Sequence, residues 1–255
     1  MKNNIKNILS LVLITFFLND LLLAQNNTDP SQLLRVVNKE LIGKKRVGRS
    51  LFEYEYRLTA ENNTGKDYDS IFVTATSNVS ALSIIDDVAS FGILPAFSTR
   101  VSEDTIKIHV DRMQSFDPSN LFFTFDNNSI EGLDINNNDV RDDVEIFIES
   151  LYSKENKLFA IAMDIAKSKQ INTTQFLTDE EIRESYLTGG IAAICMLLNG
   201  EDVTDFSAQL QEVQFNTPER IAAFRAYEQK LSTLGSFSLP SSTEIENQCS
   251  SKYPQ

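Results

Sequence analysis

The sequence is poor in the residue types on which most catalytic and nucleic-acid-binding sites depend. It has no tryptophan, one histidine and two cysteines, and its 23 basic residues stand against 36 acidic ones. Such an acidic surface repels phosphate groups and attracts divalent cations, so we expect no nucleic-acid partner. A zinc hydrolase site with one histidine would need unusual carboxylate and cysteine ligands. The chain also lacks a Gly-x-Ser-x-Gly elbow, a glycine-rich phosphate loop and a histidine-rich zinc motif, so we expect no enzyme.

The first 24 residues have the pattern of an export signal. Lys2 and Lys6 precede an apolar run over residues 8–18, and Ala24 is a small residue at a suitable cleavage point. The run is shorter than the roughly 20 residues that span a bilayer, although an uncleaved anchor is the alternative. We therefore predict a signal peptide over residues 1–24 and an exported protein, in the periplasm, on the outer surface or outside the cell.

The two cysteines are Cys195 and Cys249, about 54 residues apart. Export would place them where disulfides persist, so we predict that they pair. The chain-entropy model gives a loop of this length roughly 4 kcal/mol of stabilisation as an upper figure. A reactive thiol is the alternative, but no histidine lies near either cysteine in the sequence to lower its pKa.

The two halves of the sequence follow different periods. Over residues 34–125 apolar and polar residues tend to alternate, and β-branched and aromatic types are frequent, which indicates short strands. After residue 134 apolar residues recur at intervals of three and four, which indicates helices. We therefore predict an α+β chain, with an antiparallel β-sandwich of the immunoglobulin-like kind over residues 30–127 and a small helical domain over residues 128–255. His109 falls in the predicted strand 106–110, where we expect a sheet residue and no base.

Local signals place two helix starts in the second half. Thr178 with Glu181 forms a capping box, and Thr217 puts a capping residue before Pro218 at the first helical position. The two glycines at residues 189–190 interrupt the first of these helical patterns. They indicate a break or a close helix contact, and we interpret them as packing.

Residues 134–145 fit the twelve-residue register of an EF-hand calcium loop. Calcium takes six to eight oxygen ligands, and this register wraps them around one point. The predicted ligands of one calcium ion are Asp134, Asn136, Asn138, the backbone carbonyl of Val140, Asp142 and Glu145. The alternative is an acidic, asparagine-rich turn that caps a helix beginning near Arg141, and the two interpretations are compatible.

The loop departs from a standard EF-hand in three ways. Position six, normally glycine, is Asp139, which tolerates positive φ better than most residues, so we expect a weaker site. Position eight is Arg141, where paired hands carry an apolar residue. Residues 121–125 indicate a strand before the loop, so no incoming helix is expected. The pattern predicts a solitary loop that joins a strand to a helix.

Residues 132–145 resemble a motif of uncharacterised exported proteins of Gram-negative bacteria, typically Gly-x-Asp-x-Asn-x-Asn-Gly-Val-Arg-Asp-Asp-Val. Here the stretch is Gly-Leu-Asp-Ile-Asn-Asn-Asn-Asp-Val-Arg-Asp-Asp-Val-Glu. The strand-loop-helix order is similar to the calcium loops of dockerins and thrombospondin type 3 repeats. The segment 216–220, Asn-Thr-Pro-Glu-Arg, and the two cysteines resemble the tail of the same group. The resemblance implies a β-rich region before the loop and helices after it, and it brings no known activity.

These observations favour an exported noncatalytic protein in which calcium has a structural role at the junction of the two predicted domains. The alternative is a calcium-dependent adhesion module that binds a cell-surface or extracellular protein or a glycan. The absence of tryptophan argues against a glycan, because such sites often stack sugars on indole rings. A hydrolase with a carboxylate pair is the least favoured reading, since no positioned acid and base can be named.

Overall fold

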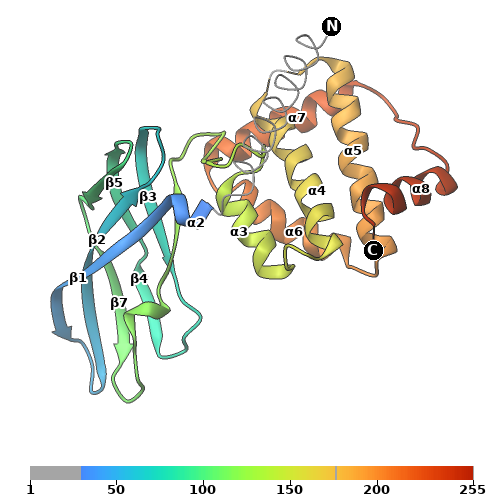
Figure 1. Cartoon of the computed structure of the whole chain (residues 1–255). Helices are drawn as coiled ribbons and strands as arrows, with labels where there is room; N and C mark the ends of the chain where they lie inside the picture. The colour runs from blue at the N-terminus through green and yellow to red at the C-terminus, as the bar shows by residue number, and fades with distance from the viewer. Residues whose placement is uncertain (1–29, 176, 255) are drawn as a thin grey trace, which may run out of the picture.

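The computed structural model describes residues 30–175 and 177–254, and it places a β-strand region before a helical region (Figure 1). A four-residue helix, α2 (Pro30–Leu33), leads into the strands. The strands are β1 (Leu34–Arg46), β2 (Leu51–Asn62), β3 (Tyr68–Thr76), β4 (Leu82–Asp86), β5 (Val88–Leu94), β6 (Ser98–Val101), β7 (Ile106–Asp111) and β8 (Phe122–Asp126). The α+β order predicted from the two periods is confirmed.

The strands form two antiparallel sheets. The first has the order β1-β2-β7-β4, with β6 also pairing β2, and the second has the order β5-β3-β8. Strands β2 and β3 follow each other in the sequence but belong to different sheets, so residues 63–67 carry the chain from one sheet to the other. Alternation alone does not reveal this, because a strand has the same period in either sheet.

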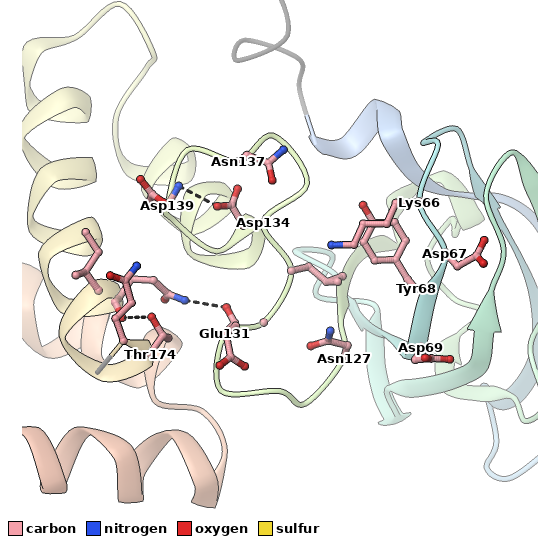
Figure 2. Close-up of a pocket in the computed structure, with 15 residues that line it drawn as sticks. Lys66, Asp67, Tyr68, Asp69, Asn127, Glu131, Asp134, Asn137, Asp139 and Thr174 are labelled. Carbon is pink, nitrogen blue, oxygen red and sulfur yellow. Dashed lines mark hydrogen bonds between the residues drawn. The ribbon is translucent and has the colours of Figure 1, made fainter. Parts of the chain in front are cut away.

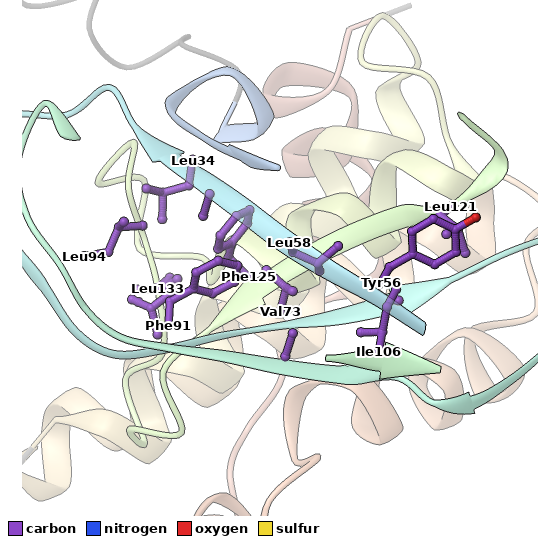
Figure 3. Packing of buried hydrophobic residues seen from close by; sticks show 14 of the residues in the cluster. Leu34, Tyr56, Leu58, Val73, Phe91, Leu94, Ile106, Leu121, Phe125 and Leu133 are labelled. Atoms are coloured by element: carbon purple, nitrogen blue, oxygen red, sulfur yellow. The ribbon is translucent and has the colours of Figure 1, made fainter. Parts of the chain in front are cut away.

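One hydrophobic cluster takes side chains from both sheets. Tyr56 and Leu58 of β2, Val73 of β3, Phe91 of β5 and Ile106 of β7 are all buried in it (Figure 3). In the second half of β2, in the second half of β3 and in β7, every second residue is buried in this cluster, and the alternation of the sequence there follows from the packing. In β7, for example, the three apolar residues are at most 1% exposed.

His109 lies between those buried positions of β7, as expected for a sheet residue. Its Nε2 is 3.2 Å from Oε2 of Glu53 on the neighbouring strand β2. A cross-strand hydrogen bond therefore accounts for this side chain.

Six helices follow the strands in the described part of the chain. They are α3 (Asp142–Leu151), α4 (Lys157–Thr174), α5 (Asp179–Leu198), α6 (Val203–Gln214), α7 (Pro218–Thr233) and α8 (Ser242–Lys252). The predicted capping box of Thr178 and Glu181 is present at the start of α5, and the Thr217 hydroxyl accepts from the Arg220 N–H at the start of α7. The sequence reasoning missed α6 and α8, although Ser241 and Glu244 form a second capping box before α8.

Helix α5 runs without a break through its two glycines. A Cβ atom at Gly189 would lie 2.6 Å from Oγ of Ser168 on α4, so glycine permits the close approach of these helices. Ser168 also donates a hydrogen bond to the backbone carbonyl of Ser185 at 2.7 Å. Gly189 therefore serves packing, Gly190 has open space around it, and the alternative of a helix break is wrong.

The predicted disulfide between Cys195 and Cys249 is present. It joins α5 to α8, and the two Cα atoms are 5.4 Å apart. The link ties the last helix of the chain to the buried cluster of the helical region, which contains both cysteines.

The β-strand and helical regions meet at the segment that follows β8. Arg220 of α7 donates hydrogen bonds to both carboxylate oxygens of Asp126 at the end of β8, at 2.6 and 2.8 Å. Its Nε donates to the backbone carbonyl of Ser129 at 2.9 Å. Both members of this ion pair are buried, with 2% of Arg220 and 7% of Asp126 exposed. A helix distant in the sequence thus holds the junction.

The predicted signal peptide lies outside the described residues and stays a prediction. Among residues 30–175 and 177–254, no helix combines the length and the apolar character needed to cross a membrane.

Candidate metal centre

The predicted calcium loop occupies the connection between β8 and α3. The chain leaves β8 at Asp126 and enters α3 at Asp142, so a strand precedes the loop and a helix follows it. The backbone N–H of Asp142 donates to the carbonyl of Leu133 at 2.7 Å, which closes the loop on itself. Position twelve of the register then falls in the first turn of α3.

Asx-type hydrogen bonds shape the first half of the loop. The Asp134 carboxylate accepts from the backbone N–H groups of Asn138 at 3.1 Å and Asp139 at 2.8 Å. Oδ1 of Asn136 accepts from the Asn138 N–H at 3.2 Å, and Oδ1 of Asn138 accepts from the Val140 N–H at 2.9 Å. The side chains at positions one, three and five thus each accept a hydrogen bond from a backbone N–H further along the loop. These bonds make the backbone turn around the three side chains.

Glu145 reaches back from α3 to the centre of this curve. The Nδ2 groups of Asn136 and Asn138 donate to its Oε2 at 2.9 and 3.0 Å. Glu145 and Asn136 are buried, with 6% and 5% exposed. Residues at positions three, five and twelve therefore meet at one carboxylate oxygen.

Asp142 joins this group less directly. Its Oδ1 accepts from the backbone N–H of Ile135 at 3.2 Å, whereas its Oδ2 is buried and has no hydrogen-bond partner among the described residues. Burial raises the pKa of Asp142 to about 8, and the charges of Asp134 and Glu145 add to the increase. A buried carboxylate oxygen with no partner is costly, and a bound cation is one way to satisfy it.

Burial also raises the pKa values of Asp134 and Glu145. The N–H donors from Asp139 and Asn138 oppose the rise at Asp134, and the two asparagine amides oppose it at Glu145. The hydrogen-bond donors therefore do not fully offset the cost of burying each ionised carboxylate. A nearby positive charge would stabilise the ionised form of both groups.

Asp139 occupies position six with a φ of +67°, the left-handed region for which glycine is the usual residue. Its side chain is 54% exposed and forms an ion pair with Lys167 of α4, with Nζ and Oδ2 2.6 Å apart. The sharp turn of the register is therefore made here without glycine.

The face of the loop toward the β-strand region borders a cavity of about 350 Å3 (Figure 2). Asp134, Asn137 and Asp139 lie on the loop side of this cavity, and Lys66 and Tyr68 lie on the opposite side. The loop thus fills part of the space between the two regions.

The donor set is suited to a hard cation. Among the described residues, no three acidic, histidine or cysteine side chains are grouped so that they could hold a metal ion, so the carboxylates of Asp134, Asp142 and Glu145 do not meet at one point in this structure. The asparagine oxygens and the Val140 carbonyl would have to complete any site on residues 134–145, and calcium is the common metal that takes such mixed oxygen ligands. Asn136 and Asn138 direct their NH2 groups toward Glu145, so each amide would turn about its last side-chain bond to present its oxygen.

Arg141, at position eight, has a role that the sequence reasoning did not find. It is 1% exposed and forms a two-point ion pair with Asp143, with N–O distances of 2.5 and 2.7 Å. It also donates to the backbone carbonyls of Val213 and Gln214, at the end of α6, at 2.7 and 3.0 Å. Arg141 therefore holds the loop against a helix about 70 residues further along the chain. Nothing local in the sequence indicates this contact.

No protein-family model, curated protein or solved structure matches the chain.

Proposed function

We propose that the protein is an exported, noncatalytic module that binds one calcium ion on residues 134–145, where calcium has a structural role. Two observations in the same loop carry the proposal: Asn136 and Asn138 converge on Glu145, and Oδ2 of Asp142 is buried and unpartnered. Ordinary helix capping accounts for carboxylates at a helix start, but it leaves this buried oxygen without a donor.

The proposed ligands are those of the EF-hand register. Asp134, Asp142 and Glu145 would move together to supply carboxylate oxygens, Asn136 and Asn138 would supply amide oxygens, and Val140 its carbonyl. A bound ion would supply positive charge to three carboxylates that burial disfavours in their ionised form. The solitary loop, with a strand on its entering side, supports a structural role over a sensor's opening of paired helices.

The position of the loop supports the same role. The loop connects β8 to α3, and the buried pair of Asp126 and Arg220 lies at the end of β8. An extracellular module with a dissociation constant near 0.1 mM would gain only about 1.4 kcal/mol from 1 mM calcium. Calcium would thus add a small stabilisation to a junction that the Asp126–Arg220 ion pair already holds.

We also propose that the two sheets are the layers of an immunoglobulin-like β-sandwich. The single buried cluster shared by both sheets supports this arrangement, because a sandwich buries the inner faces of its two sheets together.

Calcium titration by calorimetry on the chain without its first 24 residues tests the site. We expect heat from the wild type and little or none from Glu145→Gln and Asp134→Ala. Glu149→Gln is the matched control, since it makes the same chemical change one turn further along α3 and removes no proposed ligand. Equal heats from all four proteins would show that the loop does not bind calcium.

An adhesion module is the alternative function. Phe97 and Met113 are 77% and 81% exposed, but they adjoin opposite ends of β2, near Thr64 and Ser50, and so form no single apolar patch. A pull-down from surface extracts and a glycan array, each with and without chelator, tests this alternative. Capture that the chelator abolishes would favour it over a purely structural role.

A further inference from the structure

We propose that the end of the β-strand region away from the helices docks on an anionic lipid surface. Five cationic residues, named here the basic tip, lie in the turn between β1 and β2 and directly after β7: Lys44, Lys45, Arg46, Arg49 and Arg112. Residues 44–50 include four of them and no acidic residue, in a chain with 23 basic against 36 acidic residues. Positive charge is thus concentrated at one place on an otherwise acidic protein.

The basic tip lies far from the calcium loop. Strand β1 begins beside that loop, where Leu34 lines a cavity together with Ile135, and it ends at Arg46. Thirteen extended residues separate the two places by about 40 Å. Figure 1 shows the turns after β1 and β7 at the end of the β-strand region that points away from the helices. The proposal therefore does not depend on calcium binding.

Backbone hydrogen bonds hold the two parts of the basic tip together. The N–H groups of Val47 and Gly48 both donate to the carbonyl of Leu51 at 3.0 Å, which closes the turn between β1 and β2. The Arg112 N–H donates to the carbonyl of Ser50, also at 3.0 Å. The end of β7 thus lies against the turn, and two segments distant in the sequence form one surface.

The five cations have no carboxylate partner in the described part of the chain, since none of them belongs to an ion pair there. Lys44 and Arg112 lie over the ring of Phe52, at 5.6 and 5.2 Å from its centroid. Arg46 donates to two backbone carbonyls of its own turn, at 2.9 and 2.7 Å. These contacts orient the side chains but leave their charges available to an anion.

Two carboxylates lie close to the basic tip in the strand register. Glu53 is opposite Lys45, and Asp111 is opposite Leu51. Glu53 is bonded to His109 at 3.2 Å, and Asp111 accepts from the Met113 N–H at 3.0 Å. Five cations against two carboxylates leave this end of the molecule positive.

Exposed apolar side chains at both turns favour a lipid surface over a soluble polyanion. Val47 is 41% exposed and Met113 is 81% exposed, and both are next in sequence to an arginine of the basic tip. A bilayer offers phosphate groups to the cations and an apolar layer beneath them to such side chains. A soluble polyanion offers only the charge.

The acidic remainder of the chain is compatible with this orientation. At physiological ionic strength the Debye length is about 8 Å, so charges farther than this from the lipid are largely screened. Docking by the basic tip keeps the helical region well beyond that distance. The expected contact is therefore end-on and weakens as the salt concentration rises.

Sedimentation with vesicles tests the proposal on the chain without its first 24 residues. One vesicle contains equal parts of phosphatidylglycerol and phosphatidylcholine, and the other contains phosphatidylcholine alone. Chelator is present throughout, so that calcium cannot bridge carboxylates of the protein to lipid phosphates. We expect at least tenfold tighter binding to the anionic vesicle at about 0.15 M salt.

Removal of charge from the basic tip should weaken this binding. Lys45 and Arg49 are exposed, so the double variant Lys45→Gln, Arg49→Gln should fold normally. We expect about 25-fold weaker binding, because each basic residue near an anionic surface contributes about fivefold. The double variant Lys157→Gln, Arg225→Gln is the matched control, since it makes the same change of charge on α4 and α7. Its affinity should stay within twofold of the wild type.

A second pair of variants tests the apolar contact. Met113→Ser should weaken binding about tenfold, because the methionine side chain would no longer leave water on docking. Phe97→Ser is the control, since Phe97 is 77% exposed but its N–H donates to the carbonyl of Thr64, beyond the opposite end of β2. Circular dichroism of each variant checks that the fold is kept.

Four results would overturn the proposal. They are no sedimentation with the anionic vesicle, equal sedimentation with both vesicles, equal affinities in the two double variants, and equal affinities in Met113→Ser and Phe97→Ser. Retention on heparin without sedimentation with either vesicle would assign the basic tip to a soluble or glycan polyanion instead. Calcium titration of the same protein is a separate measurement, so either proposal can fail without the other.

Discussion

The ion pair between Asp126 and Arg220 offers the sharpest test of how the two regions are held together. We consider Asp126→Asn, which keeps the size of the side chain and removes its charge. Arg220 is 2% exposed and would keep its bonds to the Ser129 carbonyl at 2.9 Å and to Oδ1 of Asn216 at 2.7 Å. Its guanidinium charge would, however, lose the buried carboxylate that it faces at 2.6 and 2.8 Å.

The expected loss is about 3–5 kcal/mol of the free energy of unfolding, because removing one member of a buried pair leaves an uncompensated buried charge. Asp179→Asn is the control. Asp179 pairs with Lys230 at 2.6 Å, but the two side chains are 61% and 49% exposed. Loss of an exposed pair costs only about 0.2–1 kcal/mol. The shortest contact is 2.6 Å in both pairs, but the buried pair is a two-point arginine contact, so burial and geometry together separate the expected results.

Urea unfolding followed by far-ultraviolet circular dichroism measures both losses. A third protein, Asp126→Leu with Arg220→Met, removes both charges and should recover stability relative to Asp126→Asn. Similar losses of about 1 kcal/mol or less in Asp126→Asn and Asp179→Asn would refute the claim that the buried pair holds the junction.

The same pair sets a pH dependence whose sign follows from the structure. Burial raises the pKa of Asp126, but the hydrogen bonds and charge of Arg220 outweigh it, so the folded-state pKa lies below the ordinary value of 3.8. The resulting stabilisation is complete above the ordinary pKa and is lost as the pH falls through the lower folded value. Acid titration should therefore show a loss of stability below about pH 4 in the wild type that is reduced in Asp126→Asn.

Three further predictions concern local features, and thermal and urea unfolding measure all of them. Gly132→Ala should lower the free energy of unfolding by more than about 2 kcal/mol, because φ is +67° and the new Cβ would overlap the buried Arg141 side chain. Gly190→Ala, with open space around it in α5, should instead raise the free energy of unfolding by about 0.5–1 kcal/mol, and equal effects would contradict this pair of predictions. Asp139→Val should cost about 1–2 kcal/mol more than Asp139→Gly because of its positive φ, and the reverse order would show that the turn is not strained. Replacing Cys195 and Cys249 by alanine should cost up to about 4 kcal/mol, and an unchanged midpoint would show that the disulfide contributes nothing.

Local patterns in the sequence were sufficient for much of the fold. Alternation indicates strands because every second side chain faces the buried cluster, and the register of residues 134–145 places Asn136, Asn138 and Glu145 on one side of the loop. The helix starts at Thr178 and Thr217 can be predicted from the sequence, because a capping side chain bonds to a backbone N–H within the first turn of its own helix. The same signal at Ser241 marks α8, and the sequence reasoning overlooked it.

Apart from the disulfide, contacts between distant segments were beyond any local pattern. The division of β2 and β3 between two sheets and the packing of Ser168 against Gly189 depend on which elements become neighbours. A cavity lined by Glu145, Met163 and Tyr253 exists only because the start of α3, α4 and the segment after α8 meet. Spacing along the chain does not encode such meetings.

Two arginines show where the sequence stops being informative. Arg141 at position eight indicates from the sequence only that the loop is solitary, and Arg220 is one residue of a tail segment. Folding buries both: one holds the loop to the end of α6, and the other joins α7 to β8. The sequence by itself was enough to predict a cation loop over residues 134–145 and the change from strands to helices, because those are short-range properties. Tertiary structure alone decided which charges are buried together, because burial depends on contacts across more than 70 residues of chain.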